Sequence, residues 1–273
     1  MEITKASGAQ EAFSEHKLCN SLSAAGAPQD LVDETCRAVT EKLTPGSTTT
    51  HIWREALRYL AKKNLPVAAR YNMRYAIIAL GPAGFLFEQY VETLLQAMGY
   101  ETKRNQMIPG KCVPHEVDVT GEKGGECFLL EVKLHHEFGI KVATDVVMYA
   151  DARHEDIERA GRPCTMWVFT NTKFTENAIQ YAKCRNLKLT GWRYPKEGGL
   201  ESLIAEYALY PVTVLPSVDR FAREQFARAN MMLAQDIAPY TAGMLLKEFG
   251  ISEKRGVKIV REAQEIISPQ KAS

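Results

Sequence analysis

Two carboxylates and a lysine lie at spacings that could support metal-dependent chemistry. Glu131 and Lys133 are two residues apart, and Asp118 precedes them across the pair Gly124-Gly125. Two adjacent glycines readily adopt the positive φ values of a two-residue hairpin turn. We therefore predict an antiparallel ribbon that turns at these glycines and sets Asp118 directly opposite Glu131.

The remaining residues of this ribbon support the same pairing. It places on the opposite face a set of side chains that are all apolar: Val117, Val119, Phe128, Leu130, Val132 and Leu134. A strand that buries one face against a core requires this alternation. The pattern therefore indicates a half-buried hairpin with its acids on the polar face.

Paired acids on one face of a ribbon favour a bound cation. Two carboxylates directly opposite each other, with Cβ atoms ~4.5–5.5 Å apart, destabilise a sheet unless a positive charge lies between them. Carboxylate oxygens suit Mg²⁺ or Mn²⁺ better than zinc. Lys133 projects from the same face as Glu131 and would orient a water or offset developing negative charge. These groups predict metal-assisted hydrolysis of a phosphodiester.

With these residues, the segment 84–194 resembles the PD-(D/E)xK nuclease superfamily, and most closely its Mrr-type restriction endonuclease branch. The matching motifs are Asp118, Glu131-Val132-Lys133 and Gly84-Phe85-Leu86-Phe87-Glu88. The resemblance implies metal ligands at Asp118, Glu131 and the backbone carbonyl of Val132, a catalytic lysine at Lys133 and a helical acid at Glu88. Glu131 stands where the Mrr pattern commonly has glutamine, and His115-Glu116 replaces a glycine-rich lead.

The residues around this motif are expected to be structural or solvated. Glu92 should point to solvent with Gln89 and Gln96, and Arg153 should be a solvated surface residue that could contact the DNA backbone. His135 is expected to be a surface histidine. The segment 170–175 should close a strand and cap the next helix.

Residues 3–80 resemble the ATP-cone, a small nucleotide-binding regulatory module. The matching motifs are Ile3-Thr4-Lys5, the segment from Glu11 to Leu18, Thr49 with Ile52, and Ala68-Ala69-Arg70-Tyr71. The resemblance implies a hairpin lid over helices, with Lys5 and Lys17 on phosphates and Glu11 and Thr49 on the nucleotide. The usual arginine after Lys5 is Ala6, and the usual Asp-Gly is Ser7-Gly8. ATP or dATP would then be an effector, since the chain has no Walker-type glycine loop.

The elements that must position these motifs change in type along the chain. Helical spacing dominates 14–80 and the segment after Pro82, strand spacing appears in 115–120, 127–134, 165–170 and 187–192, and helices are predicted at 143–159, 175–185 and beyond 200. We predict a multidomain α and α/β fold. It comprises an ATP-cone-like domain (1–82), a restriction-endonuclease-like α/β/α core (83–196) and a helical domain (197–273) whose Lys254, Arg255, Lys258 and Arg261 resemble a helix-hairpin-helix element.

Composition excludes several protein classes. The 273 residues include 34 basic and 33 acidic ones, for a net charge of +1, so nucleic acid would have to be bound by a local patch. No segment approaches the ~18 consecutive apolar residues of a membrane span, and residues 1–10 do not resemble a signal peptide, so we expect a cytoplasmic protein. The six scattered cysteines form no C-x-x-C pair and are expected to be reduced.

The sequence therefore predicts a Mg²⁺-dependent DNA endonuclease regulated by ATP or dATP and dimeric as nucleases that cut both strands often are. The alternative is a nucleotide-sensing DNA-binding protein without cleavage activity. A reductase-gene repressor is disfavoured because the chain lacks a four-cysteine zinc site. A ribonuclease of the same fold stays open, because sugar selection depends on surfaces that the sequence does not display.

Overall fold

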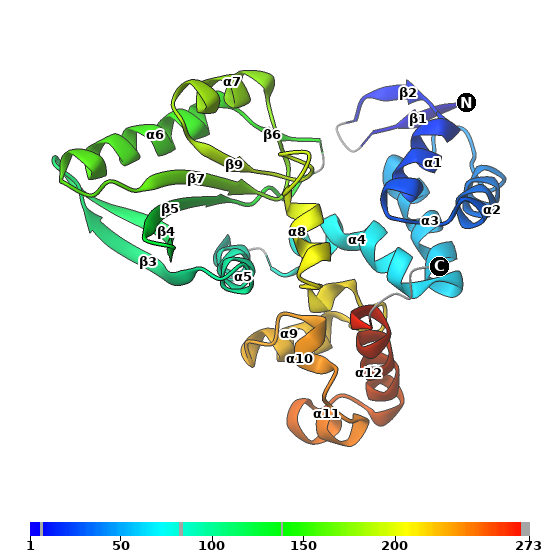
Figure 1. The fold of residues 1–273 in the computed structure, drawn as a ribbon. Helices are drawn as coiled ribbons and strands as arrows, with labels where there is room; N and C mark the ends of the chain where they lie inside the picture. Colours follow the sequence, from blue (N-terminus) through cyan, green and yellow to red (C-terminus); the bar gives the residue numbers. More distant parts are fainter. Residues whose placement is uncertain (6–7, 82–83, 138, 269–273) are drawn as a thin grey trace. The chain divides into compact units, whose positions relative to one another are not determined.

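A computed structural model describes residues 1–5, 8–81, 84–137 and 139–268 (Figure 1). The chain divides into two compact units, one of residues 1–80 and 210–273 and the other of residues 81–209. Ala6 and Ser7, which depart from the ATP-cone pattern, and Pro82, predicted at a helix start, lie outside the described residues.

The first unit opens with a short hairpin and four helices. Strands β1 (Glu2–Thr4) and β2 (Gln10–Ala12) are antiparallel, and are followed by α1 (Glu15–Ala24), α2 (Gln29–Thr40), α3 (Thr49–Lys63) and α4 (Leu65–Ala79). Ser14, Thr48 and Asn64 begin α1, α3 and α4 as side-chain caps, each accepting a backbone N–H three residues ahead. The helices enclose an apolar cluster that includes Leu22, Val39 and Leu60.

The C-terminal segment completes this unit. It comprises the 3-10 turn η1 (Val212–Val214), α9 (Arg220–Arg228), α10 (Ala234–Ile237), α11 (Ala242–Phe249) and α12 (Glu253–Ile267). The Thr213 hydroxyl donates to the carbonyl of Ala76, and Arg223 donates to the carbonyl of Ala79. Because α4 is apolar on more than one side, it packs against both segments. The residues predicted as first and third domains therefore lie in one unit, and the boundary of the second falls at 209 rather than 196.

The second unit is built on a five-stranded mixed sheet of order β3-β4-β5-β7-β9. Strands β3 (Glu101–Pro109), β4 (Pro114–Lys123) and β5 (Glu126–Lys133) are antiparallel, whereas β5, β7 (Thr165–Thr170) and β9 (Lys188–Thr190) are parallel. A small parallel pair, β6 (Lys141–Val142) and β8 (Lys173–Phe174), lies outside this sheet.

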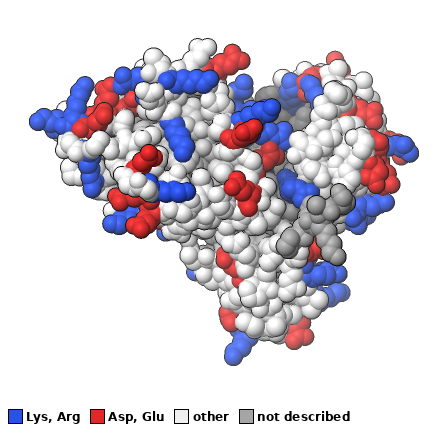
Figure 2. All heavy atoms as spheres, in the orientation of Figure 1, with Lys and Arg blue, Asp and Glu red and all other residues white. Residues whose placement is uncertain are grey.

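Helices cover both faces of the sheet. Helices α6 (Thr144–Arg159) and α7 (Glu176–Cys184) pack Val147, Ala150 and Ala178 against Leu129 and Val168. Helix α5 (Gly84–Ala97) lies on the other side, where Phe87, Tyr90 and Leu94 are fully buried, and α8 (Leu200–Glu206) follows β9 (Figure 1). The α/β character that the sequence predicts for this segment is confirmed. Basic and acidic side chains intermingle on its visible face around α6 and α7 (Figure 2).

Four of the six cysteines are paired, which contradicts the expectation that all are reduced. Cys19 and Cys36 join α1 to α2, and Cys127 and Cys164 join β5 to the segment before β7, whereas Cys112 and Cys184 are free and exposed. The paired residues are 17 and 37 positions apart in sequence, so local spacing carries no sign of either bond. Within the described ranges, no helix is long and apolar enough to cross a membrane.

Candidate active site

The β4–β5 hairpin turns where the glycines predicted it. Gly124 and Gly125 have φ values of 61° and 83°, which side-chain-bearing residues rarely adopt. From this turn the ladder runs from the Lys123–Glu126 pair to the Val119–Leu130 pair, with no change of register. The predicted pairing is therefore confirmed over this stretch.

The ladder ends one position before the two acids. Instead of a backbone pair at Asp118, the Asp118 side chain accepts a hydrogen bond from the backbone N–H of Val132 at 2.7 Å. The carboxylate thus replaces a strand carbonyl as the partner of β5. Asp118 and Glu131 therefore lie near each other where β4 and β5 cease to be paired, rather than as a regular cross-strand pair.

One part of the predicted alternation is wrong at this point. Val117 belongs to the apolar cluster that contains Leu129, not to the face of Leu130, as strict alternation would require. The pairing of β4 with β3 is interrupted at the same place. Arg104 pairs with Val119 and Gln106 with Val117, but Asn105, between them on β3, is unpaired in the ladder and has a φ of 52°. This left-handed residue interrupts the regular pleat beside Asp118.

Glu131 is held by an arginine from α6. Arg153 Nη1 lies 2.7 Å from Glu131 Oε2, and the two side chains are only 12% and 16% exposed. The Arg153 guanidinium also lies over the Tyr149 ring, 5.0 Å from its centroid. The expectation that Arg153 is solvated is therefore wrong: the turn of α6 that faces β5 directs it to Glu131 instead.

The carboxylates of this region repel one another. Burial, and then the charge of Glu131, raises the pKa of Asp118 to about 7, with a smaller contribution from Glu88. Burial, followed by the charge of Glu116, also raises the pKa of Glu88 on α5. The structure thus brings Glu88 within electrostatic range of Asp118 and Glu131. The positive charges that act on these acids, those of Arg153 and Arg104, are fewer than the carboxylates.

The donor set at Asp118 and Glu131 fits a divalent cation. Each carboxylate has one oxygen anchored by the protein, Asp118 Oδ2 by Val132 and Glu131 Oε2 by Arg153. The second oxygen of each makes no hydrogen bond to the part of the chain that the structure describes. Among those residues no group of three or more His, Cys, Asp or Glu is arranged to hold a metal, so a cation here would need backbone or water ligands as well.

Lys133 ends β5 two residues after Glu131, beside Thr170 on β7. Its side chain is exposed, and it makes no ion pair within the described ranges. The ammonium is therefore available to a group outside the protein.

Two neighbouring predictions on α5 are wrong. Glu92 does not point to solvent but lies 2.5 Å from the Arg104 guanidinium of β3, and Gln89 is buried. Glu92 thus contacts β3, a strand that sequence spacing did not predict. Gln96 is exposed, as expected, and donates to the Thr102 hydroxyl.

The segment after β5 has a structural role. The backbone N–H of His135 donates to the Asn171 side chain, which donates in turn to the His135 carbonyl, both at 2.8 Å. His135 is partly buried rather than a surface residue. Thr175 caps α7 by accepting from the N–H of Ala178, which confirms the structural interpretation of 170–175.

The tip of the β3–β4 hairpin is tied to α6. Asp156 accepts the backbone N–H groups of Cys112 and Val113, and its Oδ2 lies 2.8 Å from His115 Nε2. The neighbouring His115 and these N–H groups hold the pKa of Asp156 well below its usual range. The strand that carries Asp118 and the helix that carries Arg153 are thereby joined.

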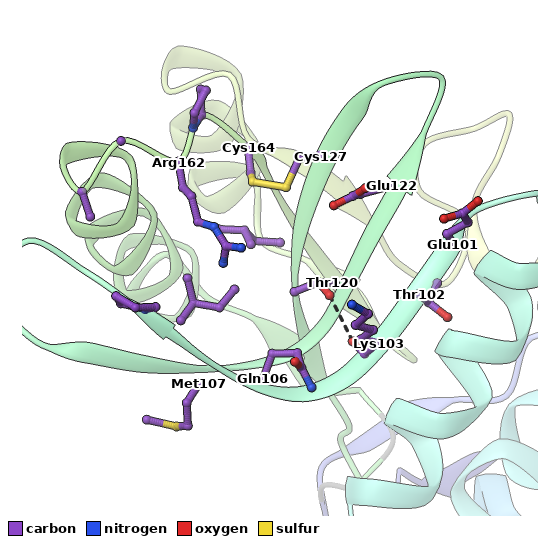
Figure 3. Close-up of a pocket in the computed structure, with 16 residues that line it drawn as sticks. Glu101, Thr102, Lys103, Gln106, Met107, Thr120, Glu122, Cys127, Arg162 and Cys164 are labelled. Atoms are coloured by element: carbon purple, nitrogen blue, oxygen red, sulfur yellow. Dashed lines mark hydrogen bonds between the residues drawn. A yellow bond between two sulfur atoms is a disulfide. The ribbon is translucent and has the colours of Figure 1, made fainter.

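A separate hollow of about 930 Å³ lies on the α6 side of the sheet (Figure 3). Lys103 and Thr120 on β3 and β4, Arg162 after α6 and the Cys127–Cys164 disulfide are among its lining residues. Its lining does not include Asp118, Glu131 or Lys133. It is therefore distinct from the carboxylate site.

The first unit brings together most of the predicted nucleotide-binding residues. Glu11 lies 2.9 Å from Lys5 Nζ and 3.0 Å from Lys17 Nζ, and these two lysines lower its pKa. A parallel bridge between Thr4 and Thr48 brings the start of α3, and hence Thr49, to the end of β1. The helix cap itself is Thr48.

Comparison with known proteins identifies the family. A family model described as "AF1548-like, C-terminal" matches residues 210–267. An uncharacterized protein of Archaeoglobus fulgidus is 40% identical over 179 residues, which is 64% of this chain and 98% of that protein. This chain belongs to the AF1548-like family.

A solved structure of the AF1548-like family shares the fold. The crystal structure of the protein of unknown function AF1548 is 36% identical and covers 68% of this chain and 98% of its own, with a TM-score of 0.57. A repair endonuclease from Pyrococcus abyssi is 19% identical over 34% of this chain and 39% of its own. Its TM-score of 0.28 is too low to indicate a shared fold.

Proposed function

We propose that this chain is a metal-dependent endonuclease that hydrolyses phosphodiester bonds in DNA and uses Mg²⁺ or Mn²⁺. The observation that carries the proposal is the pair Asp118 and Glu131 at the unpaired end of the β4–β5 ribbon, each with one oxygen anchored and one oxygen left. Lys133 follows two residues after Glu131 on the same strand, is exposed, and makes no ion pair with the residues that the structure describes.

The cation would be held by the second oxygens of Asp118 and Glu131, with the Val132 carbonyl as a further ligand. Such an ion polarises a phosphoryl oxygen and lowers the pKa of bound water. Lys133 would hydrogen-bond the attacking water or the phosphoryl oxygen and offset the negative charge that develops there. Burial raises the pKa of Glu88. This carboxyl would accept a hydrogen bond from a water of the site and could take up a proton from it.

Cleavage of supercoiled plasmid tests this proposal. With Mg²⁺ or Mn²⁺ the wild-type protein should nick or linearise the plasmid, and Asp118→Ala and Lys133→Ala should each lower the rate by about 10²–10⁴-fold, because each removes a group that acts in the transition state. Arg159→Ala is the matched control, since Arg159 is an exposed α6 residue whose ion pair among the described residues is with Glu155. Equal cleavage by all three variants would contradict the assignment.

The alternative function is nucleotide-sensing DNA binding without cleavage. One observation favours it: Glu131 already has a cationic partner in Arg153, so the acid is partly neutralised without a metal. Plasmid binding with no cleavage under either metal would support this alternative. A single-stranded RNA substrate in the same assay distinguishes a ribonuclease from a DNA endonuclease.

We also propose that residues 1–80 bind ATP or dATP as an effector. The support is that Lys5 and Lys17 both contact Glu11 on β2. Phosphate oxygens would take the place of the Glu11 carboxylate between these two lysines. A homodimer would let two sites cut both strands, and the sedimentation of the full chain with and without ATP tests that arrangement.

A further inference from the structure

We propose that Arg153 is the positioning residue of the metal site: it fixes the Glu131 carboxylate so that its second oxygen is presented to the cation. This inference rests on the proposed function. It concerns a residue that sequence spacing assigned to the surface, and it follows from how the two acids of the site are held.

The two carboxylates are anchored in parallel ways. Asp118 is fixed through Oδ2 by a backbone N–H, and Glu131 through Oε2 by the Arg153 guanidinium, each at 2.7 Å. A hydrogen bond to one oxygen restricts the rotation of the carboxylate and favours one direction for the other oxygen. Groups that orient metal ligands in this way are as much a part of such sites as the ligands themselves.

The surroundings of Arg153 restrict it to this role. Its side chain is only 12% exposed, and its guanidinium is also held over the Tyr149 ring at 5.0 Å. Because Arg153 is mostly buried and hydrogen-bonded to Glu131, its guanidinium is not placed as a surface residue that follows a phosphate would be. The contact with Glu131 is one hydrogen bond, from Nη1 to Oε2, which fixes one oxygen of the carboxylate and leaves the other.

Charge and orientation predict opposite effects when Arg153 is removed. Loss of a positive charge beside Asp118 and Glu131 would by itself strengthen cation binding. Loss of the anchor would let the Glu131 carboxylate rotate and would weaken it. The positioning inference requires that the second effect exceeds the first, which makes the sign of the change decisive.

The experiment measures binding of Mn²⁺ alone to the full chain by electron paramagnetic resonance of the free ion. Arg153→Met should weaken Mn²⁺ binding by about 10–100-fold, the usual cost of losing a group that orients a ligand. Arg153→Lys, which keeps a donor and a charge, should recover part of that loss. Arg159→Met on the same helix is the control and should bind Mn²⁺ as the wild type does.

Thermal melts ensure that each variant is folded when its affinity is measured, and Arg153→Lys supplies the comparison if Arg153→Met is unfolded. Unchanged or tighter Mn²⁺ binding by the folded variants overturns the inference and makes Arg153 a competitor of the metal. Asp118→Asn separates this failure from that of the proposed function. If Asp118→Asn loses Mn²⁺ and Arg153→Met does not, only the positioning role fails; if the wild type binds no Mn²⁺, both fail.

Discussion

Glu11 in the first unit and Asp118 in the second are carboxylates in opposite electrostatic situations. Two lysines lie within 3.0 Å of Glu11 and lower its pKa. Burial and the charge of Glu131 raise the pKa of Asp118 to about 7. The first carboxylate already has its cations, whereas the second lies among other acids. We therefore expect an anion such as phosphate to displace Glu11 from its two lysines, and a cation to bind beside Asp118.

The strongest test of this contrast replaces each acid by its amide. Asp118→Asn should weaken Mn²⁺ binding by about 10²-fold or more, because it removes the charge of a proposed ligand. Glu11→Gln should leave Mn²⁺ binding unchanged, since its carboxylate is satisfied by Lys5 and Lys17. Calorimetric titration with MnCl₂ measures both. Equal losses in the two variants would show that the contrast does not determine metal binding.

The next test concerns the anion side of the comparison. Lys17→Ala should weaken ATP binding by about 10–100-fold, since a hydrogen bond to a charged group is worth ~1.5–3 kcal/mol. Lys42→Ala is the matched control because Lys42 is an exposed lysine of the same unit that pairs with Glu55 instead. Fluorescence titration with a labelled ATP analogue gives both affinities. Similar affinities for the two variants would argue against a phosphate site at Lys5 and Lys17.

The smallest effect expected is on stability against pH. Because the folded protein keeps a proton on Asp118 up to about pH 7, which the unfolded chain has lost, metal-free stability should fall as pH rises toward that value. Asp118→Asn removes this titration and keeps an oxygen for the N–H of Val132. The Tm of the variant should exceed that of the wild type by ~2–4 °C at pH 8 and equal it at pH 4.

Glu11→Gln provides the opposite sign. A carboxyl whose pKa is lowered stabilises the fold above its unfolded pKa and loses that contribution as the pH falls. Its amide variant should therefore melt no higher than the wild type at pH 8. A rise in Tm for both amide variants would mean that general charge removal, rather than the burial of Asp118, accounts for the effect.

Local signals predicted the features that depend on short stretches of sequence. Gly124 and Gly125 set the turn and the register, and the 143–159 helix and 165–170 strand are close to their observed bounds. Strand β3 was missed because it is an edge strand whose side chains are mostly polar, with Ile108 its one fully buried residue. Without that strand, the contact of Glu92 with Arg104 could not be anticipated.

The remaining features depend on contacts between distant segments. Arg153 meets Glu131 across 22 positions, and Cys127 meets Cys164 across 37, so neither pairing has a local pattern. Val117 packs in the cluster of Leu129 beside the position where the β3–β4 ladder is interrupted at Asn105, a feature of the neighbouring strand. The first unit likewise joins distant segments, because apolar residues of α4 pack against both the N-terminal helices and the C-terminal segment.

The bond between Asp156 and the hairpin tip has a mechanical consequence. Asp156 is hydrogen-bonded to the start of β4 and the turn before it. Arg153, one turn earlier on the same helix, is hydrogen-bonded to Glu131 on β5. Helix α6 therefore contacts both β4 and β5, the strands that carry Asp118 and Glu131. Together with the β4–β5 pairing, these contacts restrain the spacing of the two acids, so that loosening α6 would loosen both strand ends at once.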